Sequence, residues 1–337
     1  MTEDALAHWV AQQMPAHKIQ LSMLSGDAGS RRYFRLNASR PPLMAVYAPP
    51  STENMPQYLA VSQLLANGGM RVPQIRAFNA AHGFMLIEDC GDQLLLSQLH
   101  ADTVDVLYRQ VLAELLKLQA IPAHTLPHYD ATRLRDEMAL CPHWFINELL
   151  GLSLDNAEHK MLNTLFNVLV DSAQEQAQVF VHRDFHSRNL MLLGEQAAVS
   201  EWVIIDFQDA VLGPVTYDLV SLLRDCYVRW SPDCARGWAL DYRQQLLAAG
   251  RLAGADDGQF LRWFDLMGLQ RHIKVLGIFA RLYLRDGKAG YLNDLPLVLR
   301  YVLEVAAQHS ECDDFSAWMQ ARVLPACKHQ PWFVAWD

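Results

Sequence analysis

The sequence lacks several features that would assign it to a specialised class of protein. None of its six cysteines forms a C-x-x-C pair, which argues against a zinc ribbon or a thioredoxin-like motif. No apolar run reaches membrane-spanning length, and the N-terminus lacks the basic start and apolar core of a signal peptide. The 28 basic residues are outnumbered by 37 acidic ones, which argues against a nucleic-acid binder or a polybasic membrane-surface protein. We therefore expect a cytoplasmic protein with reduced cysteines and no obligate protein partner.

The 337 residues are enough for about two domains, and 51% of them are hydrophobic. Residues 19–88 are predicted to form three strands, a helix and a fourth strand, in that order. The reason is that short alternating or apolar runs lie on both sides of one stretch with helical spacing. The expected strands are 19–23, 33–36, 43–47 and 84–87, and the expected helix is 55–66, which stops at Gly68 and Gly69.

Beyond residue 91 the patterns become long and amphipathic. They predict helices over 103–118, 133–149, 155–176, 216–227 and 259–284, with short strands at 179–181, 190–193 and 203–205. The chain is therefore predicted to be an α+β protein, with a small sheet-rich N-lobe at 1–90 and a larger helical C-lobe at 91–337.

The polar residues with the clearest chemical pattern lie on and after two of these short strands. Residues 181–190 read V-H-R-D-F-H-S-R-N-L, and residues 203–210 read V-I-I-D-F-Q-D-A. Asp184, Asn189 and Asp206 together offer the hard oxygen ligands that magnesium prefers, with substrate phosphate completing its shell. H-R-D with an Asn five positions after the Asp is the spacing of the kinase catalytic loop, and a following Asp-Phe is the kinase metal signature. The ordered combination predicts phosphoryl transfer.

Residues 205–219, I-D-F-Q-D-A-V-L-G-P-V-T-Y-D-L, resemble the aminoglycoside phosphotransferase and choline kinase-like family. The resemblance implies a bilobal protein-kinase-like fold and the phosphorylation of a small molecule with ATP and magnesium. Gln208 stands where protein kinases place Gly, and an A-P-E segment is absent, so protein-kinase activity is not expected.

A further resemblance runs along nearly the whole chain. Residues 26–35, 183–189 and 269–281 are similar to the bacterial N-acetylmuramate/N-acetylglucosamine anomeric kinases. This similarity implies an ATP- and Mg2+-dependent sugar kinase that phosphorylates the anomeric hydroxyl of amino sugars recovered from the cell wall.

The resemblance also implies roles for individual residues. Asp184 corresponds to the catalytic Asp that accepts the hydroxyl proton, Asn189 and Asp206 to the magnesium ligands, and Asp218 to a brace of the catalytic loop. The nucleotide would be held by a phosphate-covering turn and by the backbone of a hinge, formed by Gly26, Asp27, Ala28, Gly29 and Ser30 and by Glu88, Asp89 and Cys90. The candidates for acceptor binding are His186, Arg188, Asp209 and Arg271. Arg271, His272 and Lys274 lie on an expected helix and could reach the cleft, but the sequence favours a solvated helix face for each of them taken alone.

One departure from the kinase pattern concerns the third strand. Kinases place a Lys there and pair it with a Glu on the next helix, whereas residues 43–47 read L-M-A-V-Y. The only acid between Asp27 and Glu88 is Glu53, which lies before the helix. We expect Arg31 or Arg32 to supply the missing charge, because a guanidinium suits phosphate. Neighbouring strand residues point to opposite faces, so only one of the two should serve.

Three alternatives stay open from the sequence. The missing Lys is compatible with a pseudokinase that binds nucleotide without turnover. The His and Asp residues are compatible with a metal-dependent phosphohydrolase. The acidic C-lobe would also suit a cationic acceptor, such as an aminoglycoside or choline.

Overall fold

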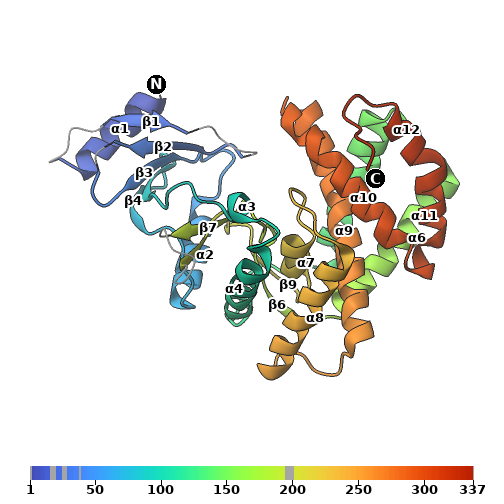
Figure 1. Ribbon diagram of the computed structural model, residues 1–337. Helices are drawn as coiled ribbons and strands as arrows, with labels where there is room; N and C mark the ends of the chain where they lie inside the picture. The colour runs from blue at the N-terminus through green and yellow to red at the C-terminus, as the bar shows by residue number, and fades with distance from the viewer. Residues whose placement is uncertain (1, 16–19, 25–28, 38, 194–200, 337) are drawn as a thin grey trace. The chain divides into compact units, whose positions relative to one another are not determined.

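The computed structural model describes residues 2–15, 20–24, 29–37, 39–193 and 201–336 (Figure 1). The chain divides into two compact units. The first comprises Met1–Ala101 and Arg188–Asp209, and the second comprises Asp102–Ser187 and Ala210–Asp337. This division lies near the lobe boundary expected at residue 90, with the added feature that residues 188–209 pack with the N-terminal segment.

The first unit is built on a five-stranded antiparallel sheet in the order β1-β2-β3-β5-β4. Its strands are β1 (Leu21–Met23), β2 (Arg32–Leu36), β3 (Leu43–Tyr47), β4 (Ile75–Asn79) and β5 (Phe84–Glu88). The remaining elements are α1 (Thr2–Gln13), α2 (Met55–Asn67), α3 (Leu95–Gln98) and the antiparallel hairpin of β7 (Leu190–Leu193) and β8 (Glu201–Ile204). The predicted strands and helix are confirmed here within a few residues, while α1, β4 and the short helix α3 were not predicted.

Helix α1 forms the core of this unit together with the sheet. Leu6, Trp9 and Val10 pack with the buried side chains of β2, β3 and β5, and the rings of Trp9 and Phe84 lie 5.8 Å apart. Burial of such side chains contributes roughly 1.5–3 kcal/mol each, which stabilises the sheet of the first unit.

The second unit is mostly helical. In chain order its elements are α4 (Val104–Leu118), α5 (Ala131–Met138), the π-helix η1 (Cys141–Leu149), α6 (Asn156–Gln174), β6 (Gln178–Val181), β9 (Val211–Pro214), α7 (Tyr217–Leu223), α8 (Pro232–Ala248), α9 (Asp257–Leu284), the 3-10 helix η3 (Ala289–Asp294), α10 (Leu295–Ala306), η4 (Ser310–Cys312), α11 (Asp313–Trp318), η5 (Met319–Val323) and α12 (Leu324–Lys328). Strands β6 and β9 pair antiparallel.

Helix α9, 28 residues long, is the central element of the second unit (Figure 1). Every residue from Trp263 to Gly277 is buried. Gly277 is required by the close approach of η1, because a Cβ there would lie 2.4 Å from the carbonyl carbon of Leu140. A helix buried over so long a stretch is a rigid support for the side chains that it presents to the site.

The predicted helices of this unit are present, with different ends. The stretch predicted over 133–149 is α5 followed by η1, and the helix predicted over 216–227 ends at Leu223. Helix α6 begins with a capping box, in which Asp155 and Glu158 each accept the other's backbone N–H at 2.9 Å. Helices α8, α10, α11 and α12 were not predicted.

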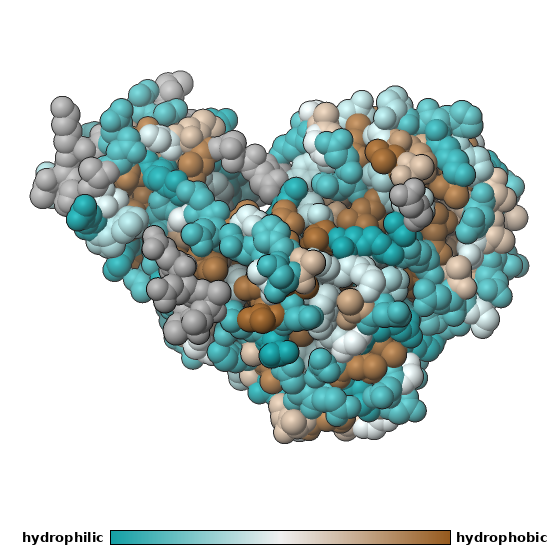
Figure 2. Space-filling model, in the orientation of Figure 1, coloured by the Kyte–Doolittle hydropathy of each residue, from teal (hydrophilic) through white to brown (hydrophobic). Residues whose placement is uncertain are grey.

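The exposed surface is largely polar on the face drawn in Figure 2. Large apolar side chains that are exposed come from separate places in the chain: Met23, Phe78, Val106, Leu247, Leu284 and Val334. Among the described residues, no helix is both long and apolar enough to cross a membrane.

Candidate active site

The segment of residues 182–189, here called the HRD segment, follows β6 and begins in the second unit. Asp218, at the start of α7 and fully buried, accepts the backbone N–H of His182 at 2.7 Å and that of Arg183 at 3.0 Å. The expected bracing contact of Asp218 is therefore confirmed. Burial raises the pKa of Asp218 to about 7, against the opposing effect of these two N–H donors. Arg183 has a positive φ of 79°, a strained conformation that the double contact holds in place.

Asp184 presents a partly exposed carboxylate, with 40% of its side chain accessible. Arg271 Nη2 lies 3.5 Å from its Oδ1, and the Nη1 of the same guanidinium donates to the carbonyl oxygen of Arg183 at 2.6 Å. Burial alone would raise the pKa of Asp184, but Arg271 and then Lys274 outweigh it and hold that pKa well below its usual range. The carboxylate is thus ionised and oriented, as a group that receives a proton must be.

Arg271, His272 and Lys274 are all buried on α9, at 3%, 0% and 4% exposure. Their interpretation as a solvated helix face is therefore wrong. The physical reason is that α5, α7 and the HRD segment cover this part of α9 and supply polar partners for the three side chains.

Glu137 of α5 is a site residue that the sequence did not reveal. Its carboxylate pairs with Arg183, accepts from the hydroxyl of Tyr129, and lies 3.0 Å from Lys274 Nζ. Burial would raise the pKa of Glu137, but Lys274 and Arg183 lower it, so it serves as the counter-charge of the cations behind Asp184. No local signal could have indicated its contacts with Arg183 and Lys274, since these two cations lie 46 and 137 residues away in the chain.

The far end of the HRD segment is fixed by Asp225 and lined by aromatic rings. The backbone N–H of Ser187 donates to Asp225 at 2.9 Å. The ring centroid of His186 lies 5.3 Å from that of Tyr227, which in turn stacks on Phe279 of α9 at 6.5 Å. His186 and Arg271, two of the residues predicted to bind acceptor, therefore share a unit with Asp184.

The predicted metal ligands lie at one end of the β7–β8 hairpin, in the first unit. The backbone N–H of Ile205 donates to the carbonyl oxygen of Asn189 at 3.1 Å, so Asn189 and Asp206 lie next to each other. Asp206 has a positive φ of 61°, which again marks a strained position. An amide and a carboxylate on neighbouring segments are donor types that fit magnesium, which takes few protein ligands and keeps water or phosphate. The described residues contain no group of three or more His, Cys, Asp or Glu that could hold a metal, so the donor set does not suit zinc.

Arg31 joins this hairpin to the loop before α2. Its guanidinium lies 2.8 Å from Glu53 Oε2, donates to Gln208 Oε1 at 2.8 Å, and lies 3.5 Å from Asp206 Oδ1. Arg32, the neighbouring residue, is exposed. The two arginines thus point to different surroundings, and Arg31 forms an arginine–glutamate pair in a chain that has no lysine on the third strand.

The other residues predicted to bind nucleotide are placed as follows. Gly26, Asp27 and Ala28 lie outside the described residues, and Gly29 and Ser30 form a bend. In the predicted hinge, the N–H of Glu88 donates to the carbonyl of Gln74 at 2.8 Å and that of Asp89 to the carbonyl of Pro42 at 3.1 Å. The backbone N–H groups of Glu88 and Asp89 therefore already donate hydrogen bonds to carbonyl oxygens of the protein.

The side chains of the hinge are also engaged. Glu88 pairs with Arg71, and Asp89 pairs with Arg35 at 2.6 Å. Arg35 also contacts Asp92, so this arginine balances two carboxylates in the protein. Arg188 and Asp209 lie in the first unit, where Asp209 is exposed and accepts from Gln208 at 3.2 Å.

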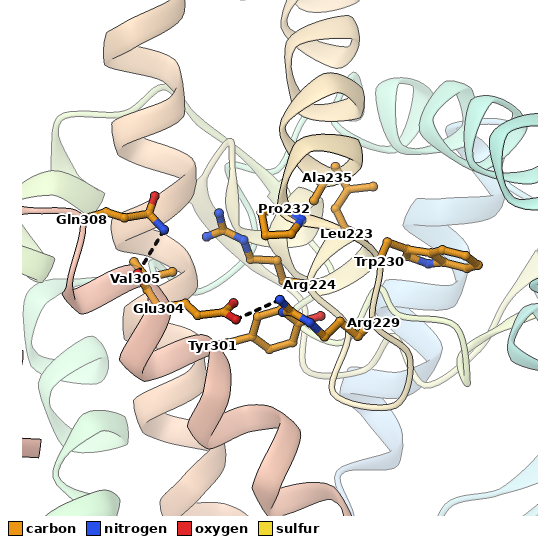
Figure 3. Close-up of a pocket in the computed structure, with 10 residues that line it drawn as sticks. All are labelled: Leu223, Arg224, Arg229, Trp230, Pro232, Ala235, Tyr301, Glu304, Val305 and Gln308. Atoms are coloured by element: carbon orange, nitrogen blue, oxygen red, sulfur yellow. Dashed lines mark hydrogen bonds and ion pairs between the residues drawn. The ribbon is translucent and has the colours of Figure 1, made fainter. Parts of the chain in front are cut away.

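A cavity of about 260 Å3 lies elsewhere in the second unit (Figure 3). It is lined by Leu223, Arg224, Arg229, Trp230, Pro232, Ala235, Tyr301, Glu304, Val305 and Gln308, none of which was predicted to be a site residue. Tyr301 in its wall stacks on His272, with ring centroids 4.7 Å apart. The preceding residue, Arg271, points to Asp184 instead, and successive helical side chains diverge by about 100°. The cavity and Asp184 therefore lie on different sides of α9.

The comparisons with known proteins agree with these features. The sequence profile described as the phosphotransferase enzyme family matches residues 20–256. A curated relative from Pseudomonas putida, named N-acetylmuramate/N-acetylglucosamine kinase, is 41% identical over 292 residues, which are 86% of this chain and 85% of that protein. A relative of the same name from Neisseria meningitidis serogroup B is 35% identical over 312 residues, or 91% of each chain.

Solved structures extend the likeness to the fold. An ADP-bound aminoglycoside phosphotransferase is similar with a TM-score of 0.60 at 15% identity, over 89% of this chain and 98% of that one. The predicted protein-kinase-like α+β fold is thereby confirmed.

Proposed function

Because the chain belongs to the phosphotransferase enzyme family, we propose that it transfers a phosphoryl group from ATP to the anomeric hydroxyl of N-acetylmuramate or N-acetylglucosamine. The names of the two relatives support this choice of acceptor, since they match 86% and 91% of the chain at 41% and 35% identity. The role in cell-wall recycling that the sequence resemblance implies belongs to the same proposal.

The observation that carries the proposal is the setting of Asp184. Its carboxylate is accessible, is 3.5 Å from a buried guanidinium, and follows a backbone braced by Asp218. Such a carboxylate can accept the proton of a sugar hydroxyl as that oxygen attacks phosphorus. Phosphoryl transfer has a loose transition state, so orientation and charge neutralisation supply most of the catalysis.

Residues of the first unit would hold the nucleotide phosphates. Asn189 and Asp206 would bind Mg2+, which when present neutralises the phosphate charge. Arg31 is held on one side by Glu53, and its Nη1 is directed to Gln208 and Asp206. We assign to the Arg31–Glu53 pair the part that the Lys–Glu pair plays in other kinases. A guanidinium can bind phosphate with two parallel N–H donors, which an ammonium group cannot do.

The decisive test is an ATP-consumption screen with magnesium across N-acetylmuramate, N-acetylglucosamine, unmodified glucose, choline and an aminoglycoside. We expect turnover with the two N-acetylated sugars, formation of an acid-labile sugar 1-phosphate, and no reaction with choline. A thermal melt with and without magnesium-ATP accompanies the screen. ATP protection without turnover of any acceptor would favour the pseudokinase, whereas phosphate release from phosphomonoesters without ATP would favour the phosphohydrolase.

A further inference from the structure

Tyr217, the first residue of α7, brings together two of the cations behind Asp184. Its side chain is fully buried. Arg271 Nη1 donates to its hydroxyl oxygen at 3.2 Å, and Lys274 Nζ donates to the same oxygen at 3.1 Å. A hydroxyl oxygen accepts at two lone pairs, so the two cations of α9 occupy both acceptor positions of Tyr217.

The hydrogen of this hydroxyl is directed to a second buried phenol. The hydroxyl oxygens of Tyr217 and Tyr129 lie 3.3 Å apart. Tyr129 has a single hydroxyl hydrogen, and it donates that hydrogen to Glu137. Burial raises the pKa of Tyr129 well above its usual range, so the hydrogen stays on its oxygen. The hydrogen between the two phenols therefore belongs to Tyr217.

These contacts form one directed chain of hydrogen bonds that ends at a carboxylate. Arg271 and Lys274 donate to Tyr217. Tyr217 donates to Tyr129, and Tyr129 donates to Glu137. Lys274 Nζ also lies 3.0 Å from Glu137 Oε2, and both carboxylate oxygens of Glu137 are paired. A buried network whose hydroxyl and carboxylate groups all have partners is rigid and specifies one arrangement of its side chains.

The chain fixes the orientation of the Arg271 guanidinium. Its Nη1 carries two hydrogens, and the one that does not go to Tyr217 goes to the carbonyl oxygen of Arg183 at 2.6 Å. Its Nε has no hydrogen-bond partner among the described residues, so the two contacts of Nη1 set the angle of the group. Nη2 is then the nitrogen that faces Asp184 Oδ1, at 3.5 Å.

The distance between Arg271 and Asp184 is itself informative. At 3.5 Å it is longer than a charge-assisted hydrogen bond, which measures about 2.7–2.9 Å. The guanidinium therefore keeps the carboxylate ionised without closing a tight ion pair over the oxygen that must take a proton. Without the Tyr217 oxygen, Nη1 would have one fixed point instead of two. A swing toward Asp184 would cover that oxygen, and a swing away would weaken the effect of the charge, so either movement lowers turnover.

We propose that Tyr217 is a positioning residue for phosphoryl transfer, which holds Arg271 at the distance from Asp184 that turnover requires. The inference rests on the proposed function, in which Asp184 accepts the proton of the sugar hydroxyl. Two adjacent residues of α7 then support the base in different ways, because Asp218 holds the backbone before it and Tyr217 holds its cation. Since Tyr217 acts through Arg271, its loss should change kcat and leave the KM for ATP unchanged.

The test measures kcat and the KM for ATP, with magnesium and N-acetylglucosamine, in the wild type, Tyr217→Phe, Arg271→Met and the double variant of the two. Tyr217→Phe should lower kcat by about 10- to 100-fold, the scale of one hydrogen bond to a charged group, and leave the KM for ATP within about twofold. The double variant should match Arg271→Met within about twofold, because a residue that acts through Arg271 has no further effect once Arg271 is gone.

Tyr242→Phe is the matched control. It removes an equally buried phenol hydroxyl of the same unit, one that donates to Gln119 at 2.8 Å, and it should keep wild-type kinetics. A second background separates catalysis from folding. In Lys274→Met the ammonium that would lose its acceptor is absent, so adding Tyr217→Phe leaves one buried donor fewer without a partner. The addition should still lower kcat by about 10- to 100-fold, with thermal melts recorded for every variant.

Wild-type kcat in folded Tyr217→Phe, in either background, would overturn the positioning role while leaving the kinase assignment in place. Losses that multiply in the double variant with Arg271→Met would do the same, and so would an equal loss of kcat in Tyr242→Phe. Failure of the wild type with both N-acetylglucosamine and N-acetylmuramate would instead contradict the proposed function.

Discussion

Substitution of Arg31 is the most informative perturbation of the first unit. In Arg31→Met the guanidinium is lost from Glu53, Gln208 and Asp206, which it contacts at 2.8, 2.8 and 3.5 Å. The Glu53 side chain is only 14% exposed, so a carboxylate is left without its cation. Two separate consequences follow, one for stability and one for catalysis.

The stability change has a limited size. Leaving a partly buried polar group without its partner costs about 1–3 kcal/mol of stability. The double variant Arg31→Met/Glu53→Gln should recover part of that cost, because it removes the uncompensated charge of Glu53.

The catalytic change should be larger and specific to ATP. Removing one preorganised electrostatic donor costs about 2–4 kcal/mol of transition-state stabilisation, which corresponds to a loss in kcat/KM for ATP of roughly 30- to 1000-fold.

The assay is steady-state kinetics at varied ATP and at varied sugar, with a thermal melt of each variant. Arg32→Met is the matched control, because Arg32 is the adjacent residue and is exposed. It should change stability by less than about 0.5 kcal/mol and leave the KM for ATP unchanged. If Arg31→Met keeps wild-type kinetics with ATP, or if Arg32→Met has the larger effect, the assignment of Arg31 to the nucleotide is refuted.

Four further changes test other parts of the site. Asp184→Asn should lower kcat by about 10²–10⁴-fold while leaving ATP binding intact in calorimetry, and a near-normal kcat would contradict its role as base. Asp206→Ala should weaken magnesium-ATP binding as well as turnover, with Asn189→Ala a milder version, and unchanged magnesium-ATP affinity in both would exclude the metal role. Arg271→Met removes the nearest cation that lowers the pKa of Asp184, so this pKa rises and the acid limb of the kcat profile moves to higher pH; an unshifted limb would show that Arg271 does not control that carboxylate. Val305→Phe, which partly fills the cavity of Figure 3, should leave the KM for both sugars within about twofold, and a selective rise would make that cavity the acceptor site.

Local patterns were sufficient for the elements that bury one face. Residues 43–47 form β3 as predicted, and α9 extends over 257–284 where 259–284 was expected, because each has an apolar pattern of the right period. Helix α8 was missed since Arg236, Gly237 and other polar or small residues interrupt its apolar spacing. Strand β4 has no fully buried side chain, so the alternation that marks a half-buried strand is weak in its sequence.

The sequence indicated candidate site residues where the chemistry is contiguous in the chain. Asp184, Asn189 and Asp206 were proposed because their types and spacing form a pattern, and Asp218 because it lies in the same run as Asp206. The positions of Arg271 and Glu137 could not be found in this way, since their burial is decided by elements far away in sequence. On α9, a charged residue that faces water and one that faces a carboxylate of the protein look alike in the sequence until the partner is placed.

The missing third-strand lysine also shows the difference between what a local pattern indicates and what depends on residues elsewhere in the chain. Strand β3 offers only apolar or aromatic side chains, so under the proposed function a cation for the phosphates would come from another element. We assign this part to Arg31, just before β2, whose several donors contact Glu53 and Gln208 together. The sequence favoured an arginine because a guanidinium suits phosphate, and strand alternation restricted the choice to one of two neighbours. The sequence did not indicate Glu53 as the partner of this cation, because Glu53 precedes helix α2 instead of lying on it. Arg31 also lies outside the regular elements, just before β2, and its guanidinium reaches the Glu53 carboxylate. A displaced cation requires a displaced anion, and this argument applies whenever one member of a charged pair is missing from its usual element.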